Sequence, residues 1–137
     1  MRGVGLSQSF RLRALRQWRS IVTGGRPWIS VVEMPGYSAR AQNLLTELEQ
    51  EAIVQMIAKD PTRGVLIEGT GGVRKMRFGA GRRGKSGGVR VVYYFHSEVM
   101  PAYLLSIFAK NEQADLPRAE RGVLAGLVQV LKRSHRR

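Results

Sequence analysis

The chain has 137 residues, 43% of them hydrophobic, and a net charge of +13 from 23 basic and 10 acidic residues. That length predicts one domain that can bury its own core. With no cysteine, disulfides and cysteine-ligated zinc are excluded and a reducing cytoplasm is the expected location. No apolar run in the sequence reaches the length of a membrane span, and the charge favours an acidic partner such as RNA, DNA, an anionic membrane or an acidic protein.

Residues 1–27 differ from the rest of the chain, because they carry six arginines and no acidic residue. Phe10–Val22 has the spacing of a short amphipathic helix, followed by glycines and a proline that would end it. The segment lacks the continuous apolar core of a secretory signal. We expect a basic, poorly ordered N-terminal extension and a folded domain over residues 28–137.

Hydrophobic periodicity predicts the elements of that domain. Strands are expected at Trp28–Met34, Val65–Ile67, Val73–Phe78, Val89–His96 and Tyr103–Ala109. Helices are expected at Tyr37–Leu45, from Thr46 to Asp60–Pro61, and at Pro117–Lys132. Thr46 and Glu49 form a capping-box pattern, which marks the start of the second helix.

This order predicts a single α+β domain. An N-terminal strand and an αα-hairpin would pack on a twisted antiparallel sheet of three to four further short strands, followed by a C-terminal helix. The helices are expected on one side of the sheet. The other side would then present Lys75, Arg77 and Arg90, which alternation places away from Met76 and Phe78.

The stretch from Gly69 to Phe95 is the most distinctive part of the sequence. It contains eight of the 16 glycines, and seven lysines or arginines without an acidic residue. Two predicted strands flank a glycine-rich basic loop within it. A hairpin with this much positive charge indicates a site for a polyanion.

Two short motifs in this stretch have weak functional readings. Gly79–Ser86 (GAGRRGKS) matches the P-loop pattern, but a P-loop needs a helix after it and a strand is predicted here. Gly69–Gly72 (GTGG) loosely resembles the clamp of KH domains, which joins two helices, whereas a strand follows here as well. A flexible basic hairpin loop explains these residues better than nucleotide hydrolysis does.

The combined pattern is more specific. GTGG-VRKMR, then GKSGG-VRVVYYF, then LLSIFAKNEQADL, in this order after a helix pair, resembles the RelE/ParE superfamily of bacterial toxins, and is most similar to the HigB-like branch of the RelE-type toxins. The resemblance covers about residues 28–137. It implies the toxin of a type II toxin–antitoxin pair, an endoribonuclease that cleaves mRNA in the ribosomal A site, with a cognate antitoxin of the helix-turn-helix, HigA-like kind.

The implied reaction can be stated in chemical terms. The 2′-hydroxyl of RNA attacks the adjacent phosphate, which requires a base for that hydroxyl, cations for the phosphorane and an acid for the 5′-oxygen. This route requires no metal, and we expect no metal and no other cofactor. The expected partners are the ribosome, mRNA and the antitoxin, with no membrane.

The resemblance suggests a role for each of several residues. Arg90 would stabilise the phosphorane through a bidentate guanidinium, and Lys75 would act as general base or as an electrostatic helper, with Arg77 on the same face. Lys110, at the end of the last strand, could project into the same cleft. The remaining cations are expected to contact rRNA without sequence preference: Arg74, Arg82, Arg83 and Lys85. Arg74 lies on the same side of its strand as Met76, so the alternative to an rRNA contact is a structural role for this residue.

The identity of the general acid stays open. After the last strand the RelE pattern has an arginine and then a tyrosine, and both are missing from the corresponding stretch here. Tyr94 and Glu112 are possible substitutes. The ordinary explanation for Tyr94 is a half-buried aromatic residue of a strand, and that for Glu112 is a surface acid near the start of a helix. His96 is a third candidate because histidine is the usual acid–base residue, although a lone histidine at a turn is common. His135, in the basic tail, is not expected to take part.

Two other functions compete with the nuclease. A ParE-like protein would share the fold and poison DNA gyrase by binding, without catalysis. A catalytically decayed RNA-binding homologue is suggested by the missing arginine and tyrosine. The gathering of Lys75, Arg77 and Arg90 on one face favours the nuclease, because a gyrase-binding protein does not need it.

Overall fold

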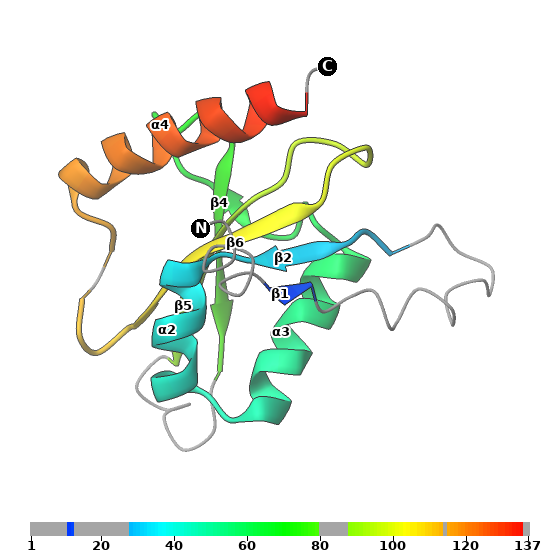
Figure 1. Cartoon of the computed structure of the whole chain (residues 1–137). Helices are drawn as coiled ribbons and strands as arrows, with labels where there is room; N and C mark the ends of the chain where they lie inside the picture. The colour runs from blue at the N-terminus through cyan, green and yellow to red at the C-terminus, as the bar shows by residue number, and fades with distance from the viewer. Residues whose placement is uncertain (1–10, 13–27, 80–87, 114, 136–137) are drawn as a thin grey trace, which may run out of the picture.

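The computed structural model describes residues 11–12, 28–79, 88–113 and 115–135 (Figure 1). The strands of this part are β1 (Arg11–Leu12), β2 (Val31–Glu33), β3 (Val65–Leu66), β4 (Val73–Phe78), β5 (Val89–Tyr94) and β6 (Ala102–Ala109). The helices are α2 (Pro35–Leu44), α3 (Glu47–Lys59) and α4 (Arg118–Ser134). The protein is therefore an α+β domain with an N-terminal helix pair and a C-terminal helix, as predicted.

The strands form one sheet in the order β1-β2-β6-β5-β4-β3. Four of the five strand pairs are antiparallel, but β2 and β6 run parallel, with Val31 beside Ala102 and Glu33 beside Leu104. The sheet is thus mixed: the four strands from β3 to β6 are antiparallel, as predicted, and the N-terminal strand β2 joins them parallel to β6. The helix pair α2–α3 and the β3–β4–β5 meander lie between these two strands in the sequence, which leaves enough chain for a parallel crossover.

The second helix begins as the sequence predicts. The Thr46 hydroxyl accepts a hydrogen bond from the Glu49 amide at 3.1 Å, and the Glu49 carboxylate accepts one from the Thr46 amide at 2.9 Å. These bonds satisfy two backbone N–H groups that the first helical turn leaves free. The helix then ends just before Asp60–Pro61.

One face of the sheet is covered by α2 and α3. Tyr37 and Ala41 of α2 and Ile53 and Ile57 of α3 are fully buried in this cluster. The sheet contributes Met76 from β4 and the following residues of β5 and β6: Val89, Val91, Tyr93, Ala102, Leu104 and Ile107. Each large aliphatic side chain of this cluster stabilises the fold by roughly 1.5–3 kcal/mol through burial.

The opposite face is covered by α4, so the helices lie on both sides of the sheet rather than on one (Figure 1). Leu124, Val128 and Leu131 of α4 are buried against Val92 and Tyr94 of β5 and against their neighbours on β4 and β6. The expected one-sided packing is therefore wrong. An apolar surface on both faces of β5 and β6 requires a cover on both faces.

A turn of glycines leads into β4. Gly69, Gly71 and Gly72 have φ angles of 82°, 81° and 126°, which side chains rarely adopt. Thr70 holds the turn: its hydroxyl donates to the Ile67 carbonyl at 2.7 Å and accepts from the Val73 amide at 3.1 Å. The GTGG segment is thus a tight turn before a strand, and not a loop between two helices.

Residues 11 and 12 form β1, which pairs antiparallel with β2 at one edge of the sheet. The expected helix over Phe10–Val22 is therefore wrong at these two positions, where the backbone instead extends the sheet. The rest of that expected helix lies outside the described residues.

Candidate active site

The pairing of β4 with β5 places three predicted site residues on one face. Arg77 stands opposite Arg90, and Lys75 stands opposite Val92. Val92 belongs to the cluster beneath α4, so by alternation all three cations lie on the α4 side of the sheet. This is the shared face that the sequence predicts for them.

These cations line one open depression of about 400 Å³. Its wall consists of Lys75, Met76 and Arg77 of β4, Arg90 of β5, and Arg63 and Val65 at the edge of the sheet. Four positively charged side chains therefore surround a space large enough for a phosphate with part of its nucleotide. We call Lys75, Arg77, Arg90 and Arg63 the cation cluster.

Arg90 is the most buried member of the cluster, with only 8% of its surface exposed. Burial lowers the pKa of its guanidinium, the charge of Arg77 lowers it further, and Asp115 opposes both effects. Like charges directly opposite each other destabilise a strand pair. The presence of Arg77 and Arg90 at opposed positions is therefore consistent with a site for an anion.

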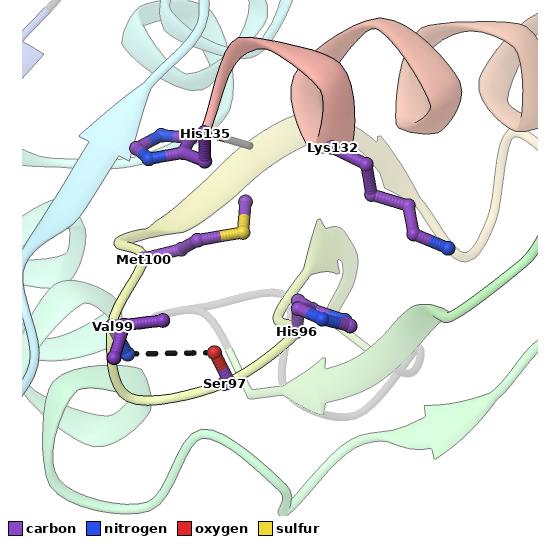
Figure 2. Close-up of a pocket in the computed structure, with 6 residues that line it drawn as sticks. All are labelled: His96, Ser97, Val99, Met100, Lys132 and His135. Atoms are coloured by element: carbon purple, nitrogen blue, oxygen red, sulfur yellow. Dashed lines mark hydrogen bonds between the residues drawn. The ribbon is translucent and has the colours of Figure 1, made fainter. Parts of the chain in front are cut away.

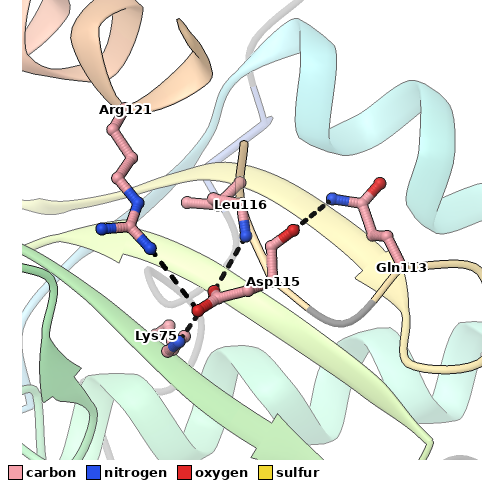
Figure 3. Close-up of polar contacts among 5 residues, drawn as sticks. All are labelled: Lys75, Gln113, Asp115, Leu116 and Arg121. Carbon is pink, nitrogen blue, oxygen red and sulfur yellow. Dashed lines mark hydrogen bonds and ion pairs between the residues drawn. The ribbon is translucent and has the colours of Figure 1, made fainter. Parts of the chain in front are cut away.

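Lys75 has an acidic partner that the sequence does not predict (Figure 3). Its Nζ lies 2.8 Å from Oδ1 of Asp115, and Nη2 of Arg121 lies 3.5 Å from Oδ2 of the same carboxylate. The hydrogen bond from Lys75 is the main cause that lowers the pKa of Asp115; the Leu116 amide and the charge of Arg121 act in the same direction, and burial opposes them. Asp115 is thus a carboxylate anion at neutral pH, bonded to a member of the cluster.

Three residues at or beside this site are not predicted from the sequence: Arg63, Asp115 and Arg121. Lys75 and Asp115 are 40 residues apart in the sequence, and the contact depends on how the segment between β6 and α4 folds back over the sheet. Asp115 does lie in the AKNEQADL stretch on which the resemblance is based. An acidic residue that follows a strand, in a protein whose predicted site is otherwise basic, is the sequence feature that could have pointed to Asp115.

Arg74 lies on the opposite face from Lys75. Its Nη1 donates to the carbonyls of Thr62 at 3.0 Å and Gly64 at 2.7 Å, so it ties β4 to the loop that precedes β3. This arrangement favours the structural role. The other three predicted rRNA contacts, Arg82, Arg83 and Lys85, lie outside the described residues.

Tyr94 shares the face of Arg90, which α4 covers, but it is only 1% exposed and lies within the apolar cluster. Burial raises the pKa of its phenol, and its hydroxyl has no hydrogen-bond partner among the described residues. Tyr94 does not line the depression. The structure therefore favours the packing role for this residue.

His96 lines a different cavity, of about 280 Å³, between the β5–β6 turn and the end of α4 (Figure 2). Ser97, Met100, Lys132 and His135 share its wall. His96 stacks on Tyr94 with 6.4 Å between ring centroids, and His135 Nε2 lies 2.8 Å from the Tyr103 hydroxyl. The structure does not bring either histidine into the depression that holds the cation cluster.

Lys110 and Glu112 follow β6. The Lys110 amide donates to the Gly88 carbonyl at 2.9 Å, which extends the pairing of β5 and β6. Glu112 forms an exposed ion pair with Arg40 of α2 at 3.4 Å and lines a third depression beside that helix. Neither residue lines the depression of the cation cluster.

The P-loop match lacks its structural context. Most of GAGRRGKS lies outside the described residues, but the chain that follows it is β5, a strand and not a helix. Within the described part of the chain, no group of three or more histidine, cysteine, aspartate or glutamate side chains is placed to hold a metal ion.

A search of the sequence against models of known protein families finds no match. None of the helices in the described ranges combines the length and the apolar character that crossing a membrane requires.

Proposed function

We propose that this protein is the toxin of a type II toxin–antitoxin pair, a RelE-type, HigB-like mRNA endonuclease that acts on the ribosome. The observation that carries this proposal is the depression in which Lys75, Arg77, Arg90 and Arg63 converge. The α+β fold, with its helix pair and C-terminal helix, agrees with the architecture that the sequence resemblance implies.

The cation cluster suits the reaction. Cleavage after attack by the 2′-hydroxyl passes through a phosphorane with extra negative charge, and fixed cations in a partly buried site stabilise such charge most effectively. Arg90 is held in the sheet by its neighbours and offers a planar fork of donors to two phosphate oxygens. Arg77, directly opposite Arg90, and Lys75, two residues before Arg77 on β4, add charge on the same face.

The ion pair of Lys75 with Asp115 supports one of the two roles proposed for this lysine. An ammonium that donates to a carboxylate at 2.8 Å already holds its proton, and a general base must have none. Lys75 therefore acts as an electrostatic helper and proton donor in this proposal.

The partners follow from the same surface. The net charge of +13 favours rRNA and mRNA over neutral ligands, and an acidic segment of a HigA-like antitoxin could cover the cation cluster. The proposed location is the cytoplasm, where translating ribosomes are found, and the proposed reaction uses no metal.

The test is an RNA-cleavage assay on translating ribosomes, with 5′ ends mapped by primer extension. Cuts within A-site codons by the parent protein, lost in Arg90→Ala and Lys75→Ala but kept in Arg118→Ala on the exposed start of α4, would support the nuclease. Intact mRNA with arrested growth and a DNA-damage response would instead support the gyrase poison. Intact mRNA without arrest would leave a decayed, RNA-binding homologue.

A further inference from the structure

The two oxygens of the Asp115 carboxylate differ in their polar contacts (Figure 3). Oδ1 accepts hydrogen bonds from the Lys75 ammonium and from the Leu116 amide, both at 2.8 Å. Among the described residues, Oδ2 makes the longer contact of 3.5 Å with Arg121. Because 44% of the side chain is exposed, the carboxylate is accessible to a hydroxyl group that enters the site.

The segment that carries Asp115 is anchored on both sides. The side-chain amide of Gln113 donates to the Asp115 carbonyl at 3.0 Å, and Leu116 is buried in the cluster beneath α4. The charge of Asp115 also acts on Arg90, where it opposes the effect of Arg77. Asp115 is not among the residues that line the depression, but its carboxylate is bonded to Lys75 and so lies beside the cations expected to hold the phosphate.

We propose that Asp115 is the general base of the cleavage reaction and accepts the proton of the attacking 2′-hydroxyl through Oδ2. This inference rests on the proposed nuclease function and assigns a role within the same site. Asp115 would be a catalytic residue, and Arg121, which contacts the same oxygen, would be a positioning residue.

The proposed step balances. The 2′-oxygen forms a bond to phosphorus while its proton passes to Asp115, and the bond between phosphorus and the 5′-oxygen breaks. The leaving 5′-oxygen takes a proton from the Lys75 ammonium. The products are a 2′,3′-cyclic phosphate and a 5′-hydroxyl. The proton on Oδ2 of Asp115 is then released to solvent water, and the neutral Lys75 amine takes one from water, which restores the resting ion pair.

In this proposal, Lys75 and Asp115 take the place of the arginine and the tyrosine that the RelE pattern has after its last strand and that are missing here. Of the three substitutes that the sequence suggests, Glu112 pairs with Arg40 beside α2, Tyr94 is enclosed by apolar side chains, and His96 lines another cavity. Those three were candidates for the general acid, a role that Lys75 takes in this proposal; Lys75 lines the depression and is bonded to the proposed base, Asp115.

The decisive variant is Asp115→Asn, because asparagine keeps an oxygen that can accept from Lys75 and Leu116 but is a far weaker base. The matched control is Glu112→Gln, which removes the same charge from the same segment. Single-turnover cleavage would be measured on programmed ribosomes. Affinity would be measured with an mRNA that carries a 2′-deoxy nucleotide at the cut site and so lacks the nucleophile.

We expect Asp115→Asn to lower the cleavage rate at least about 100-fold, with affinity for the 2′-deoxy mRNA equal to that of the parent or tighter. Asp115→Glu should recover part of the rate, and Glu112→Gln should cleave like the parent. Cleavage by Asp115→Asn within threefold of the parent, or a loss of rate matched by the loss of affinity, would overturn the assignment. A parent protein that leaves mRNA intact would overturn both the assignment and the proposed function, whereas cleavage that needs Arg90 and not Asp115 would overturn the assignment alone.

Discussion

Arg77 and Arg90 face each other directly across the β4–β5 pair, on the side of the sheet that α4 partly covers. The charge of Arg77 is one of the causes that lower the pKa of the Arg90 guanidinium. Two cations in this position repel each other in the free protein and would both be attracted by a phosphate. The site therefore costs some stability, and that cost can be measured.

Arg77→Gln should stabilise the free protein by a few tenths of a kcal/mol, because it removes a like charge opposite Arg90. The same change should weaken binding to RNA and reduce the dependence of binding on salt, since one phosphate contact is lost. Chemical denaturation and RNA titrations at several salt concentrations would measure the two effects. Arg118→Gln, on the exposed first turn of α4, is the control for net charge. A loss of stability in Arg77→Gln would contradict the repulsion.

The pH dependence of stability should reveal the ion pair of Lys75 with Asp115. Because the folded protein lowers the pKa of Asp115 below its ordinary value of 3.8, the pair contributes stability above that value. The contribution is lost as the pH falls through the lower, folded-state pKa. Both side chains are partly exposed, so we expect less than about 1 kcal/mol.

Urea denaturation of the parent and of Asp115→Asn between pH 7 and pH 3 would measure this contribution. The parent should be the more stable protein at neutral pH, and the difference should shrink as the pH falls below the ordinary carboxyl range. A difference that stays constant with pH would show that the charge of Asp115 does not contribute to stability.

Neighbouring tyrosines of β5 offer a matched pair of substitutions. The Tyr93 hydroxyl donates to the Pro61 carbonyl at 2.8 Å and accepts from the buried Gly64 amide at 2.9 Å. Tyr93→Phe should therefore cost about 1–3 kcal/mol, because it leaves a buried amide without its partner. It should also loosen the loop that carries Arg63.

Tyr94→Phe should leave stability nearly unchanged, because its buried hydroxyl has no hydrogen-bond partner among the described residues. It should also leave cleavage unchanged, since Tyr94 does not line the depression. Thermal unfolding and the ribosome assay would test both statements. A large loss of cleavage in a stable Tyr94→Phe protein would restore Tyr94 as the general acid.

Local patterns in the sequence predict the individual elements well. The range Val73–Phe78 for β4 is confirmed, because its side chains alternate between apolar and basic, and the start of α3 is confirmed because its capping box is local. Helical spacing predicts a core stripe of α4 made of Leu124, Leu127, Val128 and Leu131, of which Leu127 is partly buried and the other three are buried. Each of these patterns lies within a few neighbouring residues.

Relationships between distant segments are harder to predict. The continuously apolar sequence of β6 favours a strand buried on both faces, but it does not specify which helix covers each face. The contact of Lys75 with Asp115 depends on the path of the segment between β6 and α4, which alternation and helical periodicity do not determine. The shared face of Lys75, Arg77 and Arg90 could be predicted because adjacent strands fix it; the carboxylate beside them could not.

The most direct test of the account uses defined ribosome complexes that carry either an all-ribose mRNA or the same mRNA with 2′-deoxy nucleotides in the A-site codon. The account predicts that the parent cuts the all-ribose mRNA, gives ends with a 2′,3′-cyclic phosphate and a 5′-hydroxyl, and leaves the 2′-deoxy mRNA intact. An all-ribose mRNA that stays whole, or a 2′-deoxy mRNA that is cut at the same place, would contradict the claim that the cation cluster promotes attack by the 2′-hydroxyl.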